Sequence, residues 1–462
     1  MSETMRVLLV NSVNPHVAWE TRFPHLGFGY LVSSVRKHLA DAKIVFKIVQ
    51  DNIKAAALEF RPDIVAISAV SQNFDIAKRY AAYFTAKGVP VILGGIHISV
   101  LPHCLPRECS MACLGESEQT FVEILRSFLD NRLSSADLAR IHGIAFWEGD
   151  NLHITPERPV IKDLDSLPMP ARDLMNILHH TYMFTSRGCP FQCTFCASTR
   201  YWNRLRFFSA EYVVDEIEYL VRTYNVNLIS FFDDLFIANF SRLELILRIL
   251  GERKLLGRIR FTCNCRADVV TKETTNILAR MGFVSVGMGL ESADDETLQF
   301  LKGSKASVNQ NAKAIQCMKN AGIRANASFV IGCPRETRNQ IMKIPKFVRQ
   351  SNLDLFDVYL LTPYPGTPIW EYAKQRGLVS DNMQDWSRLD INAYRNPQKA
   401  IILSETMDRR EVLNLFKKLL RMRFRRNLIR IWRHPLHCDI FQVGYKLFVD
   451  FVMRKIQRAV RH

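Results

Sequence analysis

Short apolar runs of strand length alternate with helical patterns along most of this chain, and this alternation constrains the fold most strongly. In the first third the apolar runs, rich in Val and Ile, are 6–10 (RVLLV), 43–50 (KIVFKIVQ), 63–70 (DIVAISAV) and 89–95 (VPVILGG). A helical pattern at 29–39 follows the first run, and another ends at Gly88. Strand–helix alternation predicts a parallel sheet with helices on both faces, so we expect a doubly wound α/β domain.

Candidate ligand contacts lie where these predicted strands end. Ser68 ends one strand, Gly94 and Gly95 end the next, and His97 follows in GGIHIS. In doubly wound sheets the ligand binds at the carboxyl ends of the strands, and residues without bulky side chains let it approach the backbone. Paired glycines also make ordinary tight turns between a strand and a helix, and the spacing alone favours this second interpretation.

The central third repeats the alternation six times. Its strand-like runs are 182–187, 228–234, 259–264, 284–291, 324–332 and 356–363, with helical patterns in the gaps. Six such units predict a second α/β domain, and active residues of β/α folds of this kind lie at the carboxyl ends of the strands.

Three cysteines follow the first of these six runs. Cys189, Cys193 and Cys196 form C-x3-C-x2-C within YMFTSRGCPFQCTFCAS (182–198). Three thiolates on one loop can hold three irons of a cubane iron–sulfur cluster and leave the fourth iron open. A zinc site with His179 or His180 as the fourth ligand is an alternative, and so are inert buried thiols. The aromatic Phe195 and the preceding Arg187-Gly188 favour the cluster.

This segment resembles the radical S-adenosylmethionine (radical SAM) family, whose hallmark is C-x3-C-x-aromatic-C. The resemblance implies a partial (β/α)6 barrel and a 4Fe–4S cluster whose open iron binds the amine and carboxylate of SAM. Reduction of that cluster then cleaves SAM to a 5′-deoxyadenosyl radical. The electron would come from an external donor of the flavodoxin or ferredoxin type.

Polar residues at the predicted strand ends resemble this family's SAM contacts. By resemblance, Asp233 or Asp234 takes the place of the amine-binding element, and Arg266 and Glu291 contact the SAM carboxylate and ribose. The alternative for Asp233 and Asp234 is an ordinary helix N-cap. FVIGCPRET (329–337) is similar to the adenine segment, and LTPYPGTPIW (361–370) is similar to the closing element of one subgroup.

That subgroup carries an N-terminal, Rossmann-like cobalamin-binding domain. LGFGYL, SAV, GGIHIS and GESEQTF resemble its landmarks in order, and Ser68-x-Val70 and Gly94-Gly95 match two of its three signatures. The resemblance implies that Ser68, Gly94, Gly95 and His97 contact cobalamin. The D-x-H-x-x-G loop is absent, so we expect neither His16 nor His25 to ligate cobalt.

Further cysteines offer a competing interpretation. Cys104, Cys109 and Cys113 could hold a second cluster, as in the RNA methylthiotransferases. Their spacing and their place in the domain disfavour it. Cys263 and Cys265 alternate along a predicted strand, and we expect buried structural thiols, although one could face the barrel interior.

The basic charge of the chain is concentrated at its end. The formal net charge is +17, and residues 409–462 contain fifteen Lys and Arg against three acidic residues. Basic and large apolar residues at helical spacing predict either an interfacial helix on anionic lipid or a helix packed on the barrel with a solvated basic face; RNA binding is disfavoured. The ordinary globular composition, 48% hydrophobic and 23% charged, excludes disordered and collagenous chains and disulfide scaffolds.

The sequence thus predicts four segments: a cobalamin-binding domain (1–140), a linker (141–175), a radical SAM barrel (176–375) and a helical basic tail (376–462). The opening MSETMRVLLVNS lacks a signal peptide and no long apolar stretch follows, so we expect a cytoplasmic protein with reduced thiols, peripheral to the inner face of the membrane if the tail binds lipid.

The predicted activity is cobalamin-dependent methylation of an unactivated carbon in a hydrophobic lipid, isoprenoid or tetrapyrrole. In the mechanism implied by the resemblance, one SAM methylates cobalt, and the radical from a second SAM activates the substrate carbon. The alternatives are a tetrapyrrole-type radical oxidoreductase or cyclase, a two-cluster RNA methylthiotransferase and a non-enzymatic cobalamin or redox sensor. No catalytic acid, base or radical quencher is identified.

Overall fold

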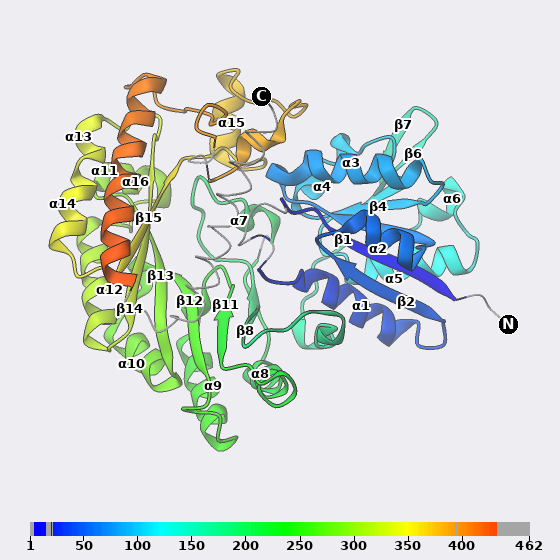
Figure 1. Ribbon diagram of the computed structural model, residues 1–462, viewed down its shortest axis with the longest axis horizontal. Coiled ribbons are helices and arrows are strands. Elements are labelled where there is room, and N and C mark those ends of the chain that lie inside the picture. Colours follow the sequence, from blue (N-terminus) through cyan, green and yellow to red (C-terminus); the bar gives the residue numbers. More distant parts are fainter. Residues whose placement is uncertain (1–3, 15–19, 21, 203, 393–395, 432–462) are drawn as a thin grey trace.

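Two lobes, each built on its own sheet, make up the protein (Figure 1). The computed structural model describes residues 4–14, 20, 22–202, 204–392 and 396–431 of the 462. The N-terminal lobe lies beside the barrel lobe, and the chain after the barrel returns to contact both.

The N-terminal lobe has a seven-stranded sheet in the order β2-β1-β3-β4-β5-β6-β7. Its strands are β1 (Met5–Asn11), β2 (Ile44–Val49), β3 (Ile64–Ser68), β4 (Val91–Gly94), β5 (Met111–Cys113), β6 (Ile144–Glu148) and β7 (Asn151–Ile154). Its helices are α1 (Leu26–His38), α2 (Ile53–Phe60), α3 (Phe74–Thr85), α4 (Ile96–Val100), α5 (Glu118–Leu129) and α6 (Ser135–Leu138). The first five strands pair in parallel in the order 2-1-3-4-5, a doubly wound arrangement that switches direction between β1 and β3.

Hydrophobic cores lie on both faces of this sheet. Along β1, Val7 and Leu9 pack with α1 and α5, whereas Leu8 and Val10 pack with α2 and α3 on the opposite face. Successive strand residues point to opposite faces, so a strand buried on both sides must be apolar throughout. The predicted doubly wound α/β fold is confirmed.

The β6–β7 hairpin extends this sheet beyond residue 140. It pairs antiparallel with β5, so part of the segment predicted as a linker continues the first sheet. The linker prediction therefore does not hold for Ile144–Ile154, because a local sequence does not reveal which distant sheet edge it joins.

The second lobe is a partial barrel of six parallel strands in chain order. Its strands are β8 (His180–Met183), β11 (Leu228–Phe231), β12 (Arg260–Arg266), β13 (Phe283–Glu291), β14 (Arg324–Ile331) and β15 (Leu355–Leu360). Its helices are α8 (Ala210–Tyr224), α9 (Phe240–Glu252), α10 (Lys272–Met281), α11 (Asp295–Lys302), α12 (Val308–Asn320), α13 (Arg338–Ile341) and α14 (Lys343–Gln350), followed by α15 (Pro368–Gln375) and α16 (Arg409–Ile431). Over the described residues β8 and β15 do not pair with each other, so the predicted six β/α units form an open barrel.

A small structure follows β8 at the barrel rim. The strands β9 (Ser186–Arg187) and β10 (Arg206–Phe207) pair antiparallel, and the short helix α7 (Ser198–Tyr201) lies between them. The segment bounded by β9 and α7 carries the three-cysteine motif.

Helix α16 packs against β15 at the edge of the barrel. Val412, Phe416 and Leu419 are buried in the barrel core, and the Asn427 amide donates to the Phe356 carbonyl (3.0 Å) and accepts from the Phe356 N–H (3.3 Å). The side-chain amide of Asn427 thus makes the hydrogen bonds to Phe356 that the backbone of a neighbouring strand would otherwise make.

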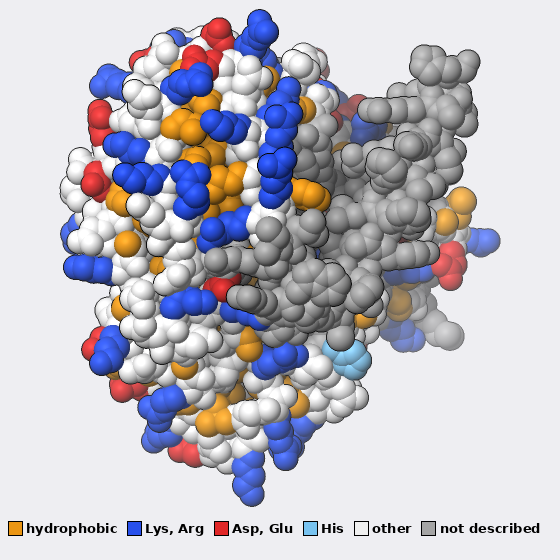
Figure 2. Space-filling model, turned by 60° about the vertical axis from the view of Figure 1, so that its left-hand side comes forward, with side chains coloured by type: hydrophobic (Ala, Val, Ile, Leu, Met, Phe, Trp, Pro, Cys, Tyr) orange, Lys and Arg blue, Asp and Glu red, His pale blue; other side chains and the backbone are white. Residues whose placement is uncertain are grey.

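Of the two interpretations of the basic tail, the packed helix holds for α16. Figure 2, with the barrel helices turned toward the viewer, shows Lys and Arg side chains around a strip of hydrophobic ones. Residues 432–462, where the rest of the predicted amphipathic tail falls, lie outside the described residues. None of the helices in the described part of the chain is long and apolar enough to cross a membrane.

Candidate functional site

The three motif cysteines lie on one loop at the carboxyl end of β8. Cys193 is buried and Cys189 and Cys196 are partly buried, and all three are free thiols. Thr194 fixes the loop: its N–H donates to the Leu301 carbonyl of α11 (2.9 Å), and its carbonyl accepts from Ile369 N–H (3.3 Å). Ile369 belongs to the segment 361–370 that resembles the family's closing element, so both neighbouring structures hold the cysteine loop in place.

The chemistry of this loop suits an iron–sulfur cluster. The three thiols interact electrostatically with one another, and burial raises the pKa of Cys189 to about 11 and those of Cys193 and Cys196 above their ordinary value. The bare thiols are therefore protonated at neutral pH, and cluster binding would release their protons. Within the described residues no three side chains converge on a single metal ion. A cubane binds each thiolate at a different corner, so convergence on one point is not required.

Arg266, at the end of β12, approaches the cysteine loop. Its Nη1 donates to Cys193 Sγ (2.8 Å), while its Nε and Nη2 form a fork to the Asp268 carboxylate (3.0 and 2.6 Å). The guanidinium also lies over the Phe191 ring at 3.8 Å from its centre. Arg266 is thus held rigidly with one N–H directed at the sulfur.

Glu291, at the end of β13, lies on the same side of the site. It is buried and has a positive φ of 60°, a strained conformation for a residue with a side chain. A shift in strand register next to Gly289 re-aims it, and a Cβ at Gly289 would lie 2.2 Å from Glu291 Oε1. Burial raises the pKa of Glu291, and Lys302 opposes this from 3.8 Å.

Lys302 is a site residue that the sequence analysis missed. It ends α11, its side chain is almost fully buried, and its Nζ donates to the Gly289 carbonyl. Its charge acts on both Cys193 and Glu291. A lysine buried near Cys193 would have indicated a site residue. The local sequence LQFLKG does not show that Lys302 is buried.

The structure separates the two predicted aspartates. Asp233 is buried, and its Oδ1 accepts from Thr185 N–H (2.9 Å), Thr185 Oγ1 (3.0 Å) and Ser186 Oγ. Burial raises its pKa to about 6, although these hydrogen bonds oppose the shift. Asp233 therefore organises the backbone ahead of the cysteine loop and is not the helix N-cap of the alternative interpretation. Asp234 is exposed, accepts from Ser198 Oγ (2.6 Å) and acts electrostatically on Cys189 and Cys196.

A cavity of about 150 Å³ lies between the two lobes. From the N-terminal lobe it is lined by Ser68, Gly94, Gly95, the loop 115–118 and the start of α1, and from the barrel lobe by Arg187, Tyr201 and Trp202. It lies at the carboxyl ends of β3 and β4, next to the switch point where doubly wound sheets bind their ligands. Three of the four predicted cobalamin contacts therefore meet at one cavity.

The two adjacent glycines differ in their role. Gly95 has a φ of 99°, and a Cβ there would lie 2.5 Å from the Ala69 carbonyl oxygen, so the turn itself requires glycine. A Cβ at Gly94 would meet no atom closer than 3.9 Å. The tight-turn interpretation therefore holds for Gly95, while Gly94 leaves open space beside the cavity.

His97 does not line the cavity. It is buried against Phe74 and Trp386, with ring centres 3.8 and 4.3 Å away, and its Nδ1 lies 3.1 Å from Ser71 Oγ. Burial lowers the pKa of His97 to about 3, which keeps the ring neutral. The structure thus places His97 in the contact between α4 and the returning segment around Trp386, away from the other predicted contacts.

His25 lines the cavity instead and is the N-cap of α1. Its Nδ1 accepts from Phe28 N–H (3.1 Å), which leaves the proton on Nε2 to be donated to Ser68 Oγ (3.2 Å). Burial lowers the pKa of His25 to about 4. Both ring nitrogens of His25 are engaged in hydrogen bonds within the protein. His16 lies outside the described residues.

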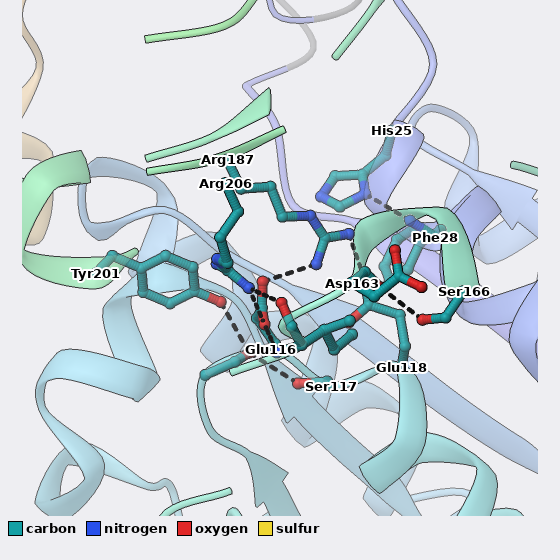
Figure 3. Close-up of polar contacts among 12 residues, drawn as sticks. His25, Phe28, Glu116, Ser117, Glu118, Asp163, Ser166, Arg187, Tyr201 and Arg206 are labelled. Atoms are coloured by element: carbon teal, nitrogen blue, oxygen red, sulfur yellow. Dashed lines mark hydrogen bonds and ion pairs between the residues drawn. The ribbon is translucent and has the colours of Figure 1, made fainter. Parts of the chain in front are cut away.

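Charged side chains join the cavity loop to the barrel lobe (Figure 3). Arg187 Nη1 and Arg206 Nη1 each donate to the Glu116 carboxylate at 2.8 Å, and Arg187 Nη2 donates to Glu118. Burial alone would raise the pKa of Glu116, but these hydrogen bonds overcome it and hold that pKa below its ordinary value. Tyr201 also donates its hydroxyl to the Gly115 carbonyl (2.8 Å).

Among the residues that the structure describes, the remaining cysteines do not gather into a second site. Cys109 and Cys113 belong to cores on opposite faces of the first sheet, and burial raises the pKa of each to about 12. Cys104 donates its S–H to the Asp381 carbonyl (3.0 Å). Cys263 and Cys265 pack in the barrel core, as expected for structural thiols. The geometry therefore disfavours a second cluster.

Two stretches of the chain match known families. Residues 183–348 match the radical SAM superfamily, and residues 19–125 match the B12 binding domain. An uncharacterized methyltransferase of Pyrococcus horikoshii, PH0819, is 32% identical over 394 residues, which cover 80% of this chain and 83% of that protein.

Two more distant similarities also cover most of the chain. An anaerobic magnesium-protoporphyrin IX monomethyl ester cyclase of Cereibacter sphaeroides is 24% identical over 418 residues, covering 86% of this chain and 67% of that protein. The structure of TsrM, a radical SAM methyltransferase of Kitasatospora setae with cobalamin and a [4Fe-4S] cluster bound, aligns with a TM-score of 0.67 at 18% identity, covering 82% of this chain and 79% of TsrM. At that identity the likeness shows the fold.

Proposed function

This chain belongs to the radical SAM superfamily and carries a B12-binding domain, and from that premise we propose that it methylates an unactivated carbon. Its cofactors are a 4Fe–4S cluster, SAM and cobalamin. When bound, they supply a 5′-deoxyadenosyl radical and a transferable methyl group. The protein binds them, orients them and excludes water.

Each group of site residues has a part in this proposal. Cys189, Cys193 and Cys196 hold the cluster. Asp234, Arg266 and Glu291 bind SAM beside it, with Lys302 fixing the Glu291 carboxylate. Ser68 and Gly94 form the cobalamin contact, and the Gly95 turn keeps them in place.

The observation that carries the proposal is the shared cavity. Arg187, Tyr201 and Trp202, which flank the cysteine loop in sequence, line the same space as the strand ends of the N-terminal lobe. Methyl transfer to a carbon radical requires the methyl donor and the radical source to face one substrate. A cavity bounded by both lobes supports that arrangement.

We place the substrate among hydrophobic metabolites of the lipid, isoprenoid or tetrapyrrole type. The magnesium-protoporphyrin cyclase among the relatives supports a tetrapyrrole-like substrate. Contact with an anionic membrane surface would suit such substrates, and α16 presents Lys417, Lys418 and Arg421 to solvent beside Phe424, which is 67% exposed. The electron donor we expect is of the flavodoxin or ferredoxin type.

The test is product analysis with the reconstituted enzyme. The full chain would be loaded anaerobically with iron, sulfide and hydroxocobalamin and incubated with reductant, SAM carrying a deuterated methyl group, and candidate substrates. A product in which a CD3 group has replaced one substrate hydrogen supports methyl transfer. Oxidised or cyclised product without label would favour the alternative, a cobalamin-dependent radical oxidoreductase or cyclase. Absence of cobalamin binding would refute both.

A further inference from the structure

Two ion pairs from a single arginine join the lobes next to the cysteine loop. Arg187 donates through Nη1 to Glu116 Oε1 (2.8 Å) and through Nη2 to Glu118 Oε1 (2.5 Å) (Figure 3). The side chains of Arg187, Glu116 and Glu118 are 8%, 4% and 9% exposed. Arg206, 9% exposed, occupies the second oxygen of Glu116.

Stability alone is a poor explanation for these charges. Removing two carboxylates and two guanidinium groups from water costs free energy that their mutual attraction repays only in part, and apolar side chains of similar size often do as well. The paired arrangement instead fixes the position of Arg187 relative to Glu116 and Glu118. A guanidinium that donates to two carboxylates allows little change in the distance or angle between them.

The positions of the three residues show what is being fixed. Arg187 is separated from Cys189 by Gly188 alone, so a shift of its side chain moves the backbone entering the cysteine loop. Gly188 has a φ of 88°, and a Cβ there would lie 2.4 Å from the Arg204 carbonyl oxygen, so this turn has no room to absorb the shift. Glu116 lies on the loop that lines the inter-lobe cavity, and Glu118 begins α5 at the end of that loop.

We propose that Arg187 is a positioning residue that couples occupancy of the cobalamin cavity to the geometry of the cluster loop. The inference rests on the proposed function. A ligand that orders loop 115–118 orders Arg187, and Arg187 orders the start of the cluster loop. Since such a coupling is reciprocal, cobalamin must tighten SAM binding by the same factor by which SAM tightens cobalamin binding.

The experiment measures this factor. The full chain with a reconstituted, oxidised cluster does not cleave SAM, so SAM affinity can be determined by equilibrium dialysis with and without hydroxocobalamin. The wild type should bind SAM at least about fivefold more tightly when hydroxocobalamin is present, as is typical of coupled sites. Arg187→Lys keeps the charge but cannot form the fork, and Glu118→Gln keeps the shape but removes one charge. In both variants the ratio should fall toward one.

A second readout needs neither cluster nor SAM. In the cofactor-free chain, hydroxocobalamin should slow hydrogen exchange of the peptide 182–198 in the wild type and leave it unchanged in the two variants. The matched control is Arg172→Lys, which disturbs another fully buried Arg–Glu pair, with Glu216; because Arg172 also donates to the Tyr182 carbonyl (2.9 Å), protection in this control is compared over residues 187–198. This control should keep the wild-type ratio and protection.

An unchanged ratio in both variants, or a wild type without coupling, would overturn the inference. If Arg187→Lys does not fold, Glu118→Gln decides by itself. These outcomes are separate from those of the proposed function, because an enzyme that binds cobalamin and methylates its substrate while showing no coupling would refute only the inference.

Discussion

Acidification should destabilise the N-terminal lobe through His25, which the structure keeps neutral. Burial lowers the pKa of His25 to about 4, whereas the unfolded chain restores the ordinary value of 6.5. Between pH 6.5 and about pH 4, His25 is protonated in the unfolded chain and neutral in the folded protein. The free energy of unfolding therefore falls as the pH falls through this window.

The size of the effect follows from the two pKa values. At 1.36 kcal/mol for each pKa unit, lowering the pH from 7 to 5 removes about 2 kcal/mol of stability through this one group. The matched variant is His25→Asn, since asparagine is also a favourable N-cap and should preserve the start of α1 without a titratable ring.

The assay is urea unfolding of the cofactor-free wild type and variant at both pH values, followed by circular dichroism. The wild type should lose about 2 kcal/mol more than the variant on acidification. His97, whose pKa burial lowers to about 3, contributes equally to both proteins and cancels in the comparison. The same loss in both proteins would refute the argument, because it would mean that His25 titrates normally in the folded state.

Three further predictions concern the cofactor sites. Cys193→Ala should abolish SAM cleavage and lower the bound iron, measured by 5′-deoxyadenosine formation and metal analysis; cleavage at the wild-type rate would exclude the cluster assignment. Gly95→Ala should lower the free energy of unfolding in urea by at least about 2 kcal/mol, because Gly95 has a positive φ and lies close to the Ala69 carbonyl. Gly94→Ala should keep the wild-type stability and weaken hydroxocobalamin binding. Equal stabilities of the two variants would contradict the turn argument. Lys302→Met should weaken SAM binding about tenfold in equilibrium dialysis, because Glu291 loses its nearby cation, and wild-type affinity would remove Lys302 from the site.

Local patterns were enough to predict the first four strands of the N-terminal sheet and the six strands of the barrel. The strand runs around Val7–Val10 and the six barrel strands are apolar because they are buried on one or both faces. The run of apolar residues in the sequence therefore indicates the buried strand. The cysteine motif was equally local, since its three members share one loop. What the sequence could not supply was the pairing of distant segments, such as the β6–β7 hairpin with β5.

The site residues show the same division. Ser68 and Gly94 were found because strand ends of a parallel sheet meet at one edge. His97 was assigned to the cavity because it follows the glycines, but its helix turns it toward Trp386, nearly 300 residues further on. The Lys302 contacts join two elements of the barrel, and the Arg187 ion pairs join the two lobes; no periodicity in the sequence predicts either set.

The most direct test of the central claim is the cofactor content of the chain. After anaerobic purification and reconstitution with iron, sulfide and hydroxocobalamin, the protein would be examined by ultraviolet–visible spectroscopy and by iron, sulfide and cobalt analysis. We predict one 4Fe–4S cluster and one cobalamin per chain. Two clusters without cobalt would contradict the assignment of the N-terminal lobe and direct the search toward RNA substrates.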